Sequence, residues 1–288
     1  MKVDLVHTQT SDGMRLDGVL HEVNSNPTSQ SDLDAIICFS GIGSNFYGSS
    51  LIARICDRLG SHGVAALSVN TRGHDGISTA STTFGGKRQG AAFEIIDDCR
   101  YDVSAWIQFL TKQGHRRIGL LGHSLGAIKV VYAQAYASEA NVARVIALSP
   151  PSLNHRRFLD SKDASDYRRS LEAAETFMAA GAPEMLFQAT FPFSMAMSPA
   201  TYLDKYGSAD RYDILRFANQ VNCPLAFIYG SKELQAEQTA FAGITDQLER
   251  LTWPATGRPT IDVIPGANHF YAGVVAELLD EISRIVTS

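Results

Sequence analysis

The sequence has few features of secreted, membrane-spanning or metal-binding proteins. Its 288 residues include only four cysteines, Cys38, Cys56, Cys99 and Cys223, which are widely scattered and form no CxxC pair. Neither a disulfide framework nor a zinc site is therefore predicted. No apolar run approaches the ~18 residues of a membrane span, and the N-terminus lacks the apolar core of a secretory signal. We expect a cytoplasmic protein that does not enter the membrane.

A basic stripe is also lacking. The net charge is -5, and the arginine pairs at 116–117, 156–157 and 168–169 are short and separated. Nucleic-acid-binding proteins usually concentrate Lys and Arg on one face, so we expect no nucleic-acid partner. Hydrophobic residues make up 45% of the chain and charged residues 19%, which is typical of a globular protein with a sizeable core.

Strand-like and helix-like segments alternate through the first half of the chain. Residues 1–23 predict a hairpin, because two alternating stretches flank Ser11-Asp12-Gly13. Near-continuous apolar strands then alternate with amphipathic helices, a pattern typical of a parallel sheet covered on both faces. The predicted strands lie in 35–44, which ends in a glycine-rich loop, in 64–70, in 117–124 and in 142–152, where two prolines stop the strand; the predicted helices lie at 50–63, 94–114 and 125–139.

This alternation stops after two consecutive prolines, Pro150 and Pro151. Residues 152–220 contain helical stretches and no convincing strand, so we predict that they form an inserted helical cap. The alternation resumes with strands at 223–231 and 260–266 and helices around 236–251 and 272–286. The predicted α/β core therefore comprises residues 1–151 and 221–288.

The most informative motif is Gly122-His123-Ser124-Leu125-Gly126, which lies between an apolar strand and a helix. A serine in a tight strand-to-helix turn can be merely structural. The pattern, however, resembles the G-x-S-x-G nucleophile elbow of the α/β-hydrolase fold. This resemblance covers nearly the whole chain. It implies a mostly parallel eight-stranded sheet flanked by helices, with a helical cap, and it makes Ser124 the nucleophile.

A serine nucleophile needs a base, which is usually a histidine. In α/β-hydrolases the histidine follows the last strand, and the order along the chain is serine, acid, histidine. His269, in the sequence "VIPGANHFY", occupies that place. His123 is part of the elbow itself and is expected to point away from the catalytic side. His74, in "NTRGHDG", matches a family position after the fourth strand, where the histidine usually fixes the conformation of the loop.

The acid is expected after the strand "LAFIYG". Glu233 follows Gly230 by three residues, where the resemblance usually places an aspartate. The fold accepts either acid, so we predict Glu233 as the third member of the triad. Glu237, Asp246 and Asp160 remain alternatives, and a solvated carboxylate of the loop is the alternative interpretation of Glu233.

The resemblance also implies an oxyanion hole made of two backbone N–H groups. One belongs to Leu125, directly after the nucleophile. The other belongs to Ile42, or to Gly43 if the register differs by one residue. The sequence here is Ser40-Gly41-Ile42-Gly43, with serine where the family often has histidine. A glycine turn without a catalytic role is the alternative interpretation.

Substrate specificity is expected to depend on the cap. The stretch 185–198 is rich in Phe and Met, which is typical either of an apolar pocket or of internal packing. Lys129, on the helix after the elbow, is predicted to be a surface or snorkelling lysine, and contact with a carboxylate of the substrate is the alternative interpretation. We predict that four apolar side chains contact the substrate: Phe46, Tyr47, Phe191 and Met195.

Together these features predict a serine hydrolase of the carboxylesterase type that cleaves a small or medium apolar ester through an acyl-enzyme. Its partner would be a small-molecule substrate, and no cofactor or metal is expected. A thioesterase, lactonase or C–C bond hydrolase would use the same triad. Some proteins of this fold only bind a ligand, which is the non-enzymatic alternative. The sequence does not indicate an oligomeric state.

Overall fold

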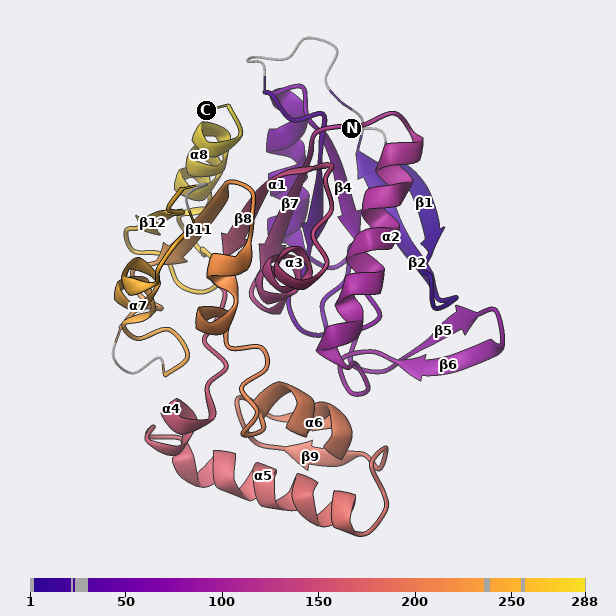
Figure 1. Ribbon diagram of the computed structural model, residues 1–288, viewed down its shortest axis with the longest axis vertical. Coiled ribbons are helices and arrows are strands. Elements are labelled where there is room, and N and C mark those ends of the chain that lie inside the picture. Colours follow the sequence, from indigo (N-terminus) through magenta and orange to yellow (C-terminus); the bar gives the residue numbers. More distant parts are fainter. Residues whose placement is uncertain (1–2, 22, 24–30, 236–238, 255–256, 288) are drawn as a thin grey trace.

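An eight-stranded sheet forms the centre of the protein in the computed structural model, which describes residues 3–21, 23, 31–235, 239–254 and 257–287 (Figure 1). The strand order is β1-β2-β4-β3-β7-β8-β11-β12. β2 is antiparallel to β1 and β4, and the other neighbours are parallel. The predicted fold class and N-terminal hairpin are thus confirmed. The strands are β1 Val3–Gln9, β2 Arg15–His21, β3 Ala35–Phe39, β4 Ala65–Val69, β7 Ile118–His123, β8 Val142–Leu148, β11 Leu225–Gly230 and β12 Thr260–Ile264.

Helices cover both faces of this sheet (Figure 1). Two of them, α1 and α8, share one hydrophobic core, and α2, α3 and α7 contribute to the other. A short 3-10 helix, η1 (Ile96–Asp98), leads into α2. The helix bounds are α1 Ser50–Ser61, α2 Cys99–Lys112, α3 Leu125–Tyr136, α7 Ile244–Arg250 and α8 Val275–Val286. The helix predicted around 236–251 begins later than expected, and its residues 236–238 lie outside the described part.

Strand β3 shows why the strands read as continuous apolar runs. Ile36 and Cys38 belong to the core under α1 and α8, whereas Ile37 and Phe39 belong to the core under α2 and α3. Successive side chains of a strand point to opposite faces, and both faces of this sheet are covered. Alternation with polar residues is therefore absent from the sequence of β3.

The chain between β8 and β11 leaves the sheet and forms the cap, which lies beyond one end of the sheet (Figure 1). It is not wholly helical. The strands β9 and β10 pair antiparallel within the Phe- and Met-rich stretch, where we expected no strand. The predicted boundaries at 152 and 220 remain a prediction. The cap elements are α4 His155–Leu159, α5 Ala164–Ala179, β9 Phe187–Ala189, β10 Met195–Met197, α6 Pro199–Tyr206, η2 Ile214–Arg216 and η3 Ala218–Gln220.

A second hairpin, β5 Ser78–Thr82 and β6 Gly85–Gln89, projects beside the cap (Figure 1). This hairpin was not predicted from the sequence. Its strands are mostly exposed, and of their residues only Ala80 and Gln89 are buried. Because the segment has almost no apolar face, hydrophobic periodicity gives no signal for it.

Lys129 is buried rather than on the surface, with only 1% of the residue exposed. Its ammonium group pairs with the buried carboxylate of Glu94 and donates a hydrogen bond to Oγ1 of Thr71 at 2.9 Å. The prediction of a surface lysine was wrong because other parts of the chain cover α3 on the side that carries Lys129.

Within the described residues, no helix combines the length and the apolar character that a membrane crossing requires. This agrees with the absence of a long apolar run in the sequence.

Candidate active site

Ser124 lies in a sharp turn between β7 and α3. Its backbone has φ 57° and ψ -122°, a strained conformation for a residue with a side chain. The flanking glycines allow this turn. A Cβ at Gly122 would lie 2.3 Å from the carbonyl oxygen of Gly126, and a Cβ at Gly126 would lie 2.4 Å from that of Ser40. The elbow therefore requires glycine at both positions.

His269 connects Ser124 to Glu233. Its Nε2 atom lies 3.0 Å from Oγ of Ser124, and its Nδ1 atom lies 2.9 Å from Oε2 of Glu233. An ionised carboxylate can only accept hydrogen bonds, so Nδ1 carries the proton and Nε2 is free to accept the serine proton. This is the arrangement of a nucleophile, a base and an orienting acid.

The Glu233 side chain is almost completely buried, whereas that of His269 is 26% exposed. Oε1 of Glu233 accepts hydrogen bonds from Oγ of Ser149 at 2.5 Å and from the backbone N–H of Gly230 at 2.6 Å. Glu233 is thus not a solvated loop carboxylate. Of the alternative acids, Asp160 has a 74% exposed side chain, Asp246 lies in the first turn of α7, and Glu237 lies outside the described residues.

His123 is packed against the back of the His269 loop. Its Nε2 donates a hydrogen bond to the backbone carbonyl of His269 at 2.8 Å, and the two rings are 4.9 Å apart. Burial and the neighbouring His269 lower the pKa of His123 to about 4. His123 is therefore neutral near pH 7, and this hydrogen bond holds the loop that carries His269.

Ile42 and Leu125, the predicted oxyanion donors, both line the cavity that contains Ser124. The position of a Cβ built on Gly41 is only 3.1 Å from Cβ of Ser124, so the loop after β3 approaches Ser124 closely. Leu125 begins α3, where backbone N–H groups lack partners within the helix. The geometry places both backbone segments beside Ser124.

The loop that follows Ile42 is held by Asp75. This carboxylate accepts hydrogen bonds from Nδ2 of Asn45 at 2.5 Å and from the Tyr47 hydroxyl at 2.9 Å, and it pairs with Nδ1 of His74 at 2.9 Å. Burial raises the pKa of Asp75, but these three partners bring it below its ordinary value. His74 and Asp75 thus tie the loop after β4 to the candidate oxyanion loop.

Ser124 opens into a cavity of about 630 Å³ between the sheet and the cap. His269 and Glu233 also contribute to its wall. The remaining lining is strongly aromatic, and the ring of Phe241 lies 5.2 Å from that of His269. The aromatic residues of the wall are Phe158, Phe191, Phe193, Tyr206, Phe241 and Phe270. Such a wall fits an apolar ligand.

The structure places only one of the four predicted substrate contacts on this wall. Phe191 lines the cavity, whereas Phe46, Tyr47 and Met195 are not among the described residues that line it. Tyr47 is 66% exposed and bonded to Asp75. Met195 belongs to β10, and its methyl group is 3.6 Å from the Cβ position of Gly43. These three residues lie around the candidate oxyanion loop.

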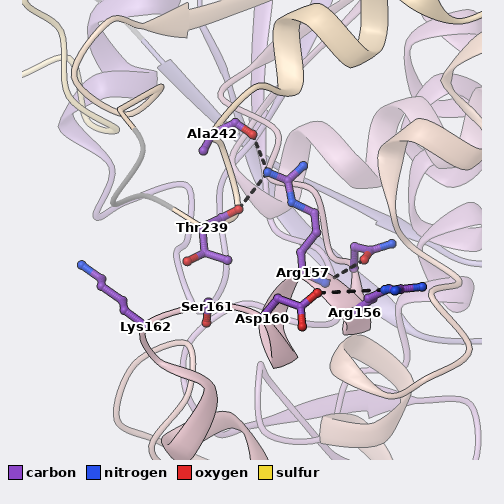
Figure 2. A pocket seen from close by; sticks show the side chains of 8 residues that line it. Arg156, Arg157, Asp160, Ser161, Lys162, Thr239 and Ala242 are labelled. Carbon is purple, nitrogen blue, oxygen red and sulfur yellow. Dashed lines mark hydrogen bonds and ion pairs between the residues drawn. The ribbon is translucent and has the colours of Figure 1, made fainter.

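A second cavity of about 660 Å³ lies beside the first, and both include Lys162 and Thr239 in their walls (Figure 2). Arg157 points across it and donates hydrogen bonds to the backbone carbonyls of Thr239 at 3.0 Å and Ala242 at 2.5 Å. Arg157, on α4 of the cap, therefore fixes the segment that carries Phe241 against His269.

No group of three or more His, Cys, Asp or Glu side chains in the described part of the chain is arranged to hold a metal ion.

Several residues around Ser124, His269 and Glu233 were not predicted from the sequence. Ser149 contacts Glu233 and Phe241 contacts His269, although each pair is far apart in the sequence. Tyr271, two residues after His269, contacts Ser149. Ser149 directly follows strand β8, and a polar residue at the carboxyl end of a parallel strand is a signal that could have identified it.

Sequence comparison identifies the family of this chain. A model of the "Alpha/beta hydrolase family" matches residues 36–282. The chain therefore belongs to the alpha/beta hydrolase family, and it has the fold of a hydrolase. Comparison with curated protein sequences gives no match.

Solved structures with the same fold are similar over almost the whole chain. The alpha/beta hydrolase GrgF from Penicillium sp. sh18 has a TM-score of 0.71 at 16% identity, covering 99% of this chain and 98% of that chain. Est1E from Butyrivibrio proteoclasticus with bound ferulic acid has a TM-score of 0.64 at 17% identity, covering 97% of both chains. A soluble variant of monoglyceride lipase from Saccharomyces cerevisiae, in complex with a substrate analogue, has a TM-score of 0.64 at 13% identity, covering 99% and 96%.

Proposed function

We propose that the protein is a serine hydrolase of the carboxylesterase type, which cleaves small or medium apolar esters through an acyl-enzyme. One observation carries this proposal: the side chains of Ser124, His269 and Glu233 form a continuous line of hydrogen bonds at the wall of an aromatic cavity. A serine with a hydrogen-bonded base, itself oriented by a buried acid, is the arrangement that acyl transfer requires.

In the first half of the reaction, Oγ of Ser124 forms a bond to the ester carbonyl carbon while Nε2 of His269 takes the serine proton. The carboxylate of Glu233 stabilises the imidazolium that results. The carbonyl oxygen becomes an oxyanion, and the backbone N–H groups of Ile42 and Leu125 donate to it. The bond to the leaving alcohol then breaks, and His269 gives the proton to the alcohol oxygen.

The second half repeats these steps with water. His269 accepts a proton from the water, the water oxygen attacks the acyl carbon, and the bond to Ser124 breaks as His269 returns the proton to Oγ. The products are a carboxylic acid and the free serine. Protein groups and water carry every proton transfer in this scheme.

The shape of the cavity supports an apolar substrate. A volume of about 630 Å³ is within the usual range for small-molecule sites, and aromatic rings such as Phe158 and Phe191 can pack against an aryl or alkyl acyl group. Among the similar structures, Est1E holds ferulic acid, an aromatic acid, and the yeast monoglyceride lipase holds a substrate analogue. Both aryl and alkyl esters therefore belong in a test of specificity.

The test is turnover of p-nitrophenyl esters of increasing acyl length and of methyl ferulate, with the Ser124→Ala variant as the matched control. We expect hydrolysis by the wild type and at least a ~10³-fold lower rate for Ser124→Ala. A thioester and a lactone in the same panel show whether the protein hydrolyses these related substrates faster than the esters. Equal rates for both proteins would overturn the proposal, and ligand binding without turnover would favour a binding protein.

We also propose that the protein acts in the cytoplasm on a small molecule. The proposal rests on the four cysteines, which are scattered in the sequence and free in the structure, because disulfides are rare in reducing compartments. Fractionation of the producing cells tests this location.

A further inference from the structure

The triad acid of this chain is a glutamate, whose side chain has one more rotatable bond than an aspartate. Its carboxylate must be held from the side opposite His269 if Oε2 is to face Nδ1 of that ring. Oε1 of Glu233 accepts hydrogen bonds from the backbone N–H of Gly230 and from Oγ of Ser149. One oxygen is thus occupied by two donors, and the other is left for His269.

A second hydroxyl extends this line of donors. The Tyr271 hydroxyl lies 2.8 Å from Oγ of Ser149 and 2.9 Å from the carbonyl oxygen of Ile228. The carboxylate can only accept, so the Ser149 proton goes to Glu233. Oγ of Ser149 then has only lone pairs to offer Tyr271, so the single Tyr271 proton is shared between that oxygen and the carbonyl oxygen of Ile228. Burial and the charge of Glu233 raise the pKa of Tyr271, which keeps its hydroxyl protonated as a donor.

The two residues come from different parts of the site. Ser149 follows β8, and Tyr271 lies two residues after His269. Both have left-handed backbones, with φ 49° and 56°, as does the nucleophile Ser124 at 57°. Such strain persists in non-glycine residues only where the surrounding structure imposes it, and it concentrates at functional sites.

We propose that Ser149 and Tyr271 are positioning residues of the catalytic site, which orient the carboxylate of Glu233 through the hydrogen-bond chain from Tyr271 to Ser149 to Glu233. The inference rests on the proposed function, since it assigns the two hydroxyls a part in the same reaction. It predicts that they influence turnover through Glu233 and leave substrate binding almost unchanged.

The chain offers a matched control. Ser152 is fully buried, as is Ser149, and its hydroxyl donates to the buried carboxylate of Asp213 at 2.9 Å. Ser152→Ala and Ser149→Ala therefore remove the same group from a similar environment, and we expect similar losses of thermal stability. If Ser149 has only a structural role, the two variants will also have similar kcat values.

The first measurement compares kcat and KM for the ester that the wild type hydrolyses best. We expect Ser149→Ala to lower kcat by about 10- to 100-fold, with KM changed less than ~3-fold. Tyr271→Phe keeps the ring and loses one hydroxyl further from the carboxylate, so we expect a smaller loss of about 3- to 10-fold. Ser152→Ala should stay within ~2-fold of the wild type. A normal kcat for both Ser149→Ala and Tyr271→Phe would overturn the inference.

The second measurement is a double-mutant cycle with Glu233→Gln. If Ser149 acts through Glu233, the double variant should have a kcat less than ~3-fold below that of Glu233→Gln. The carboxylate that Ser149 orients is already lost in Glu233→Gln, so the second change has little left to remove. If Ser149→Ala lowers kcat as much in the Glu233→Gln background as in the wild type, Ser149 acts independently of Glu233.

A crystal structure of Ser149→Ala tests the orientation independently of turnover. We expect the carboxylate of Glu233 to move away from its 2.9 Å contact with His269. An unchanged carboxylate would overturn the inference, whatever the activity. Failure of the proposed function looks different, because the wild type and Ser124→Ala would then hydrolyse esters at the same rate.

Discussion

Lys205 of the cap places its Nζ atom 3.4 Å from Oε2 of Glu94 in the core. The same carboxylate pairs with Lys129 on α3, the helix that begins directly after Ser124. Lys205 also donates a hydrogen bond to the backbone carbonyl of Ala91 at 3.0 Å. All three charged side chains are almost completely buried. One shared carboxylate therefore fastens the cap to the helix that positions Ser124.

This cluster predicts a pH-dependent contribution to stability. Burial raises the pKa of Glu94, but the charges of Lys129 and Lys205 outweigh it and hold the pKa below its ordinary value of 4.5. The stabilisation from Glu94 is thus complete above pH 4.5 and is lost as the pH falls through the lowered folded-state pKa. We expect Glu94→Gln to lower the free energy of unfolding by about 3–5 kcal/mol at pH 7, because two buried ammonium groups lose their partner.

Urea unfolding at several pH values measures this effect. The difference between the wild type and Glu94→Gln should be largest at neutral pH and should shrink below pH ~4. Glu184→Gln is the matched control, because Glu184 pairs with Arg88 in the exposed surface and such pairs contribute at most ~1 kcal/mol. Equal destabilisation by the two variants would contradict this account of the cluster.

The contacts of Asp75 predict an effect on turnover without direct contact with Ser124. In Asp75→Asn, an amide faces the Asn45 amide and the Tyr47 hydroxyl, so the loop that carries Ile42 loses an anchor. We expect kcat to fall by about 10- to 100-fold, since displaced oxyanion donors stabilise the transition state less. Tyr47→Phe removes one of the three partners and should cost less than ~5-fold. Initial rates with a p-nitrophenyl ester measure both, and unchanged kcat in Asp75→Asn would show that Asp75 does not support the loop.

The identity of the triad acid is tested by three matched variants. Glu233→Gln should express normally and lose roughly 10²- to 10⁴-fold in kcat, because the imidazolium of His269 loses its partner. Asp160→Asn and Asp246→Asn remove the charges of the two alternative acids that the structure describes. Both variants should keep a kcat within ~2-fold of the wild type. Near-normal turnover by Glu233→Gln would remove Glu233 from the triad.

The glycine of the elbow gives a prediction about packing. A Cβ at Gly126 would lie 2.4 Å from the carbonyl oxygen of Ser40 and 2.6 Å from that of Phe39, so Gly126→Ala must push α3 away from the loop after β3. We expect a loss of about 1–3 kcal/mol of stability and a lower kcat. Gly76→Ala is the control, because no atom lies within 4 Å of its Cβ position. Thermal unfolding measures the melting temperatures of Gly126→Ala and Gly76→Ala. Equal melting temperatures for the two variants would contradict the predicted clash.

Much of the fold could be predicted because its signals are local. The apolar runs of β3, β7 and β11 identify buried parallel strands, since a strand covered on both faces has no polar alternation. The elbow around Ser124 is also local, as its strand, glycines and helix lie within a few residues. The positions of His269 and Glu233 followed from the order of elements in the resemblance, and the structure brings both side chains into contact with each other.

The remaining features depend on contacts that sequence patterns do not reveal. Lys129 resembles a surface lysine because its partner Glu94 lies in another segment of the chain. The β5–β6 hairpin has no apolar face, and β9 and β10 are only three residues long each. Tyr47 follows the oxyanion loop in sequence, yet its hydroxyl is bound to Asp75. Side-chain direction in loops is decided by such tertiary contacts.

The central claim is that Ser124 is a nucleophile activated by His269. The most direct measurement is reaction with a fluorophosphonate probe, followed by mass spectrometry of the tryptic peptides. We predict one adduct per chain, on Ser124, formed in parallel with the loss of ester hydrolysis and strongly slowed in His269→Ala. A protein that keeps full turnover without an adduct on Ser124, or that is labelled equally fast in His269→Ala, would contradict the account.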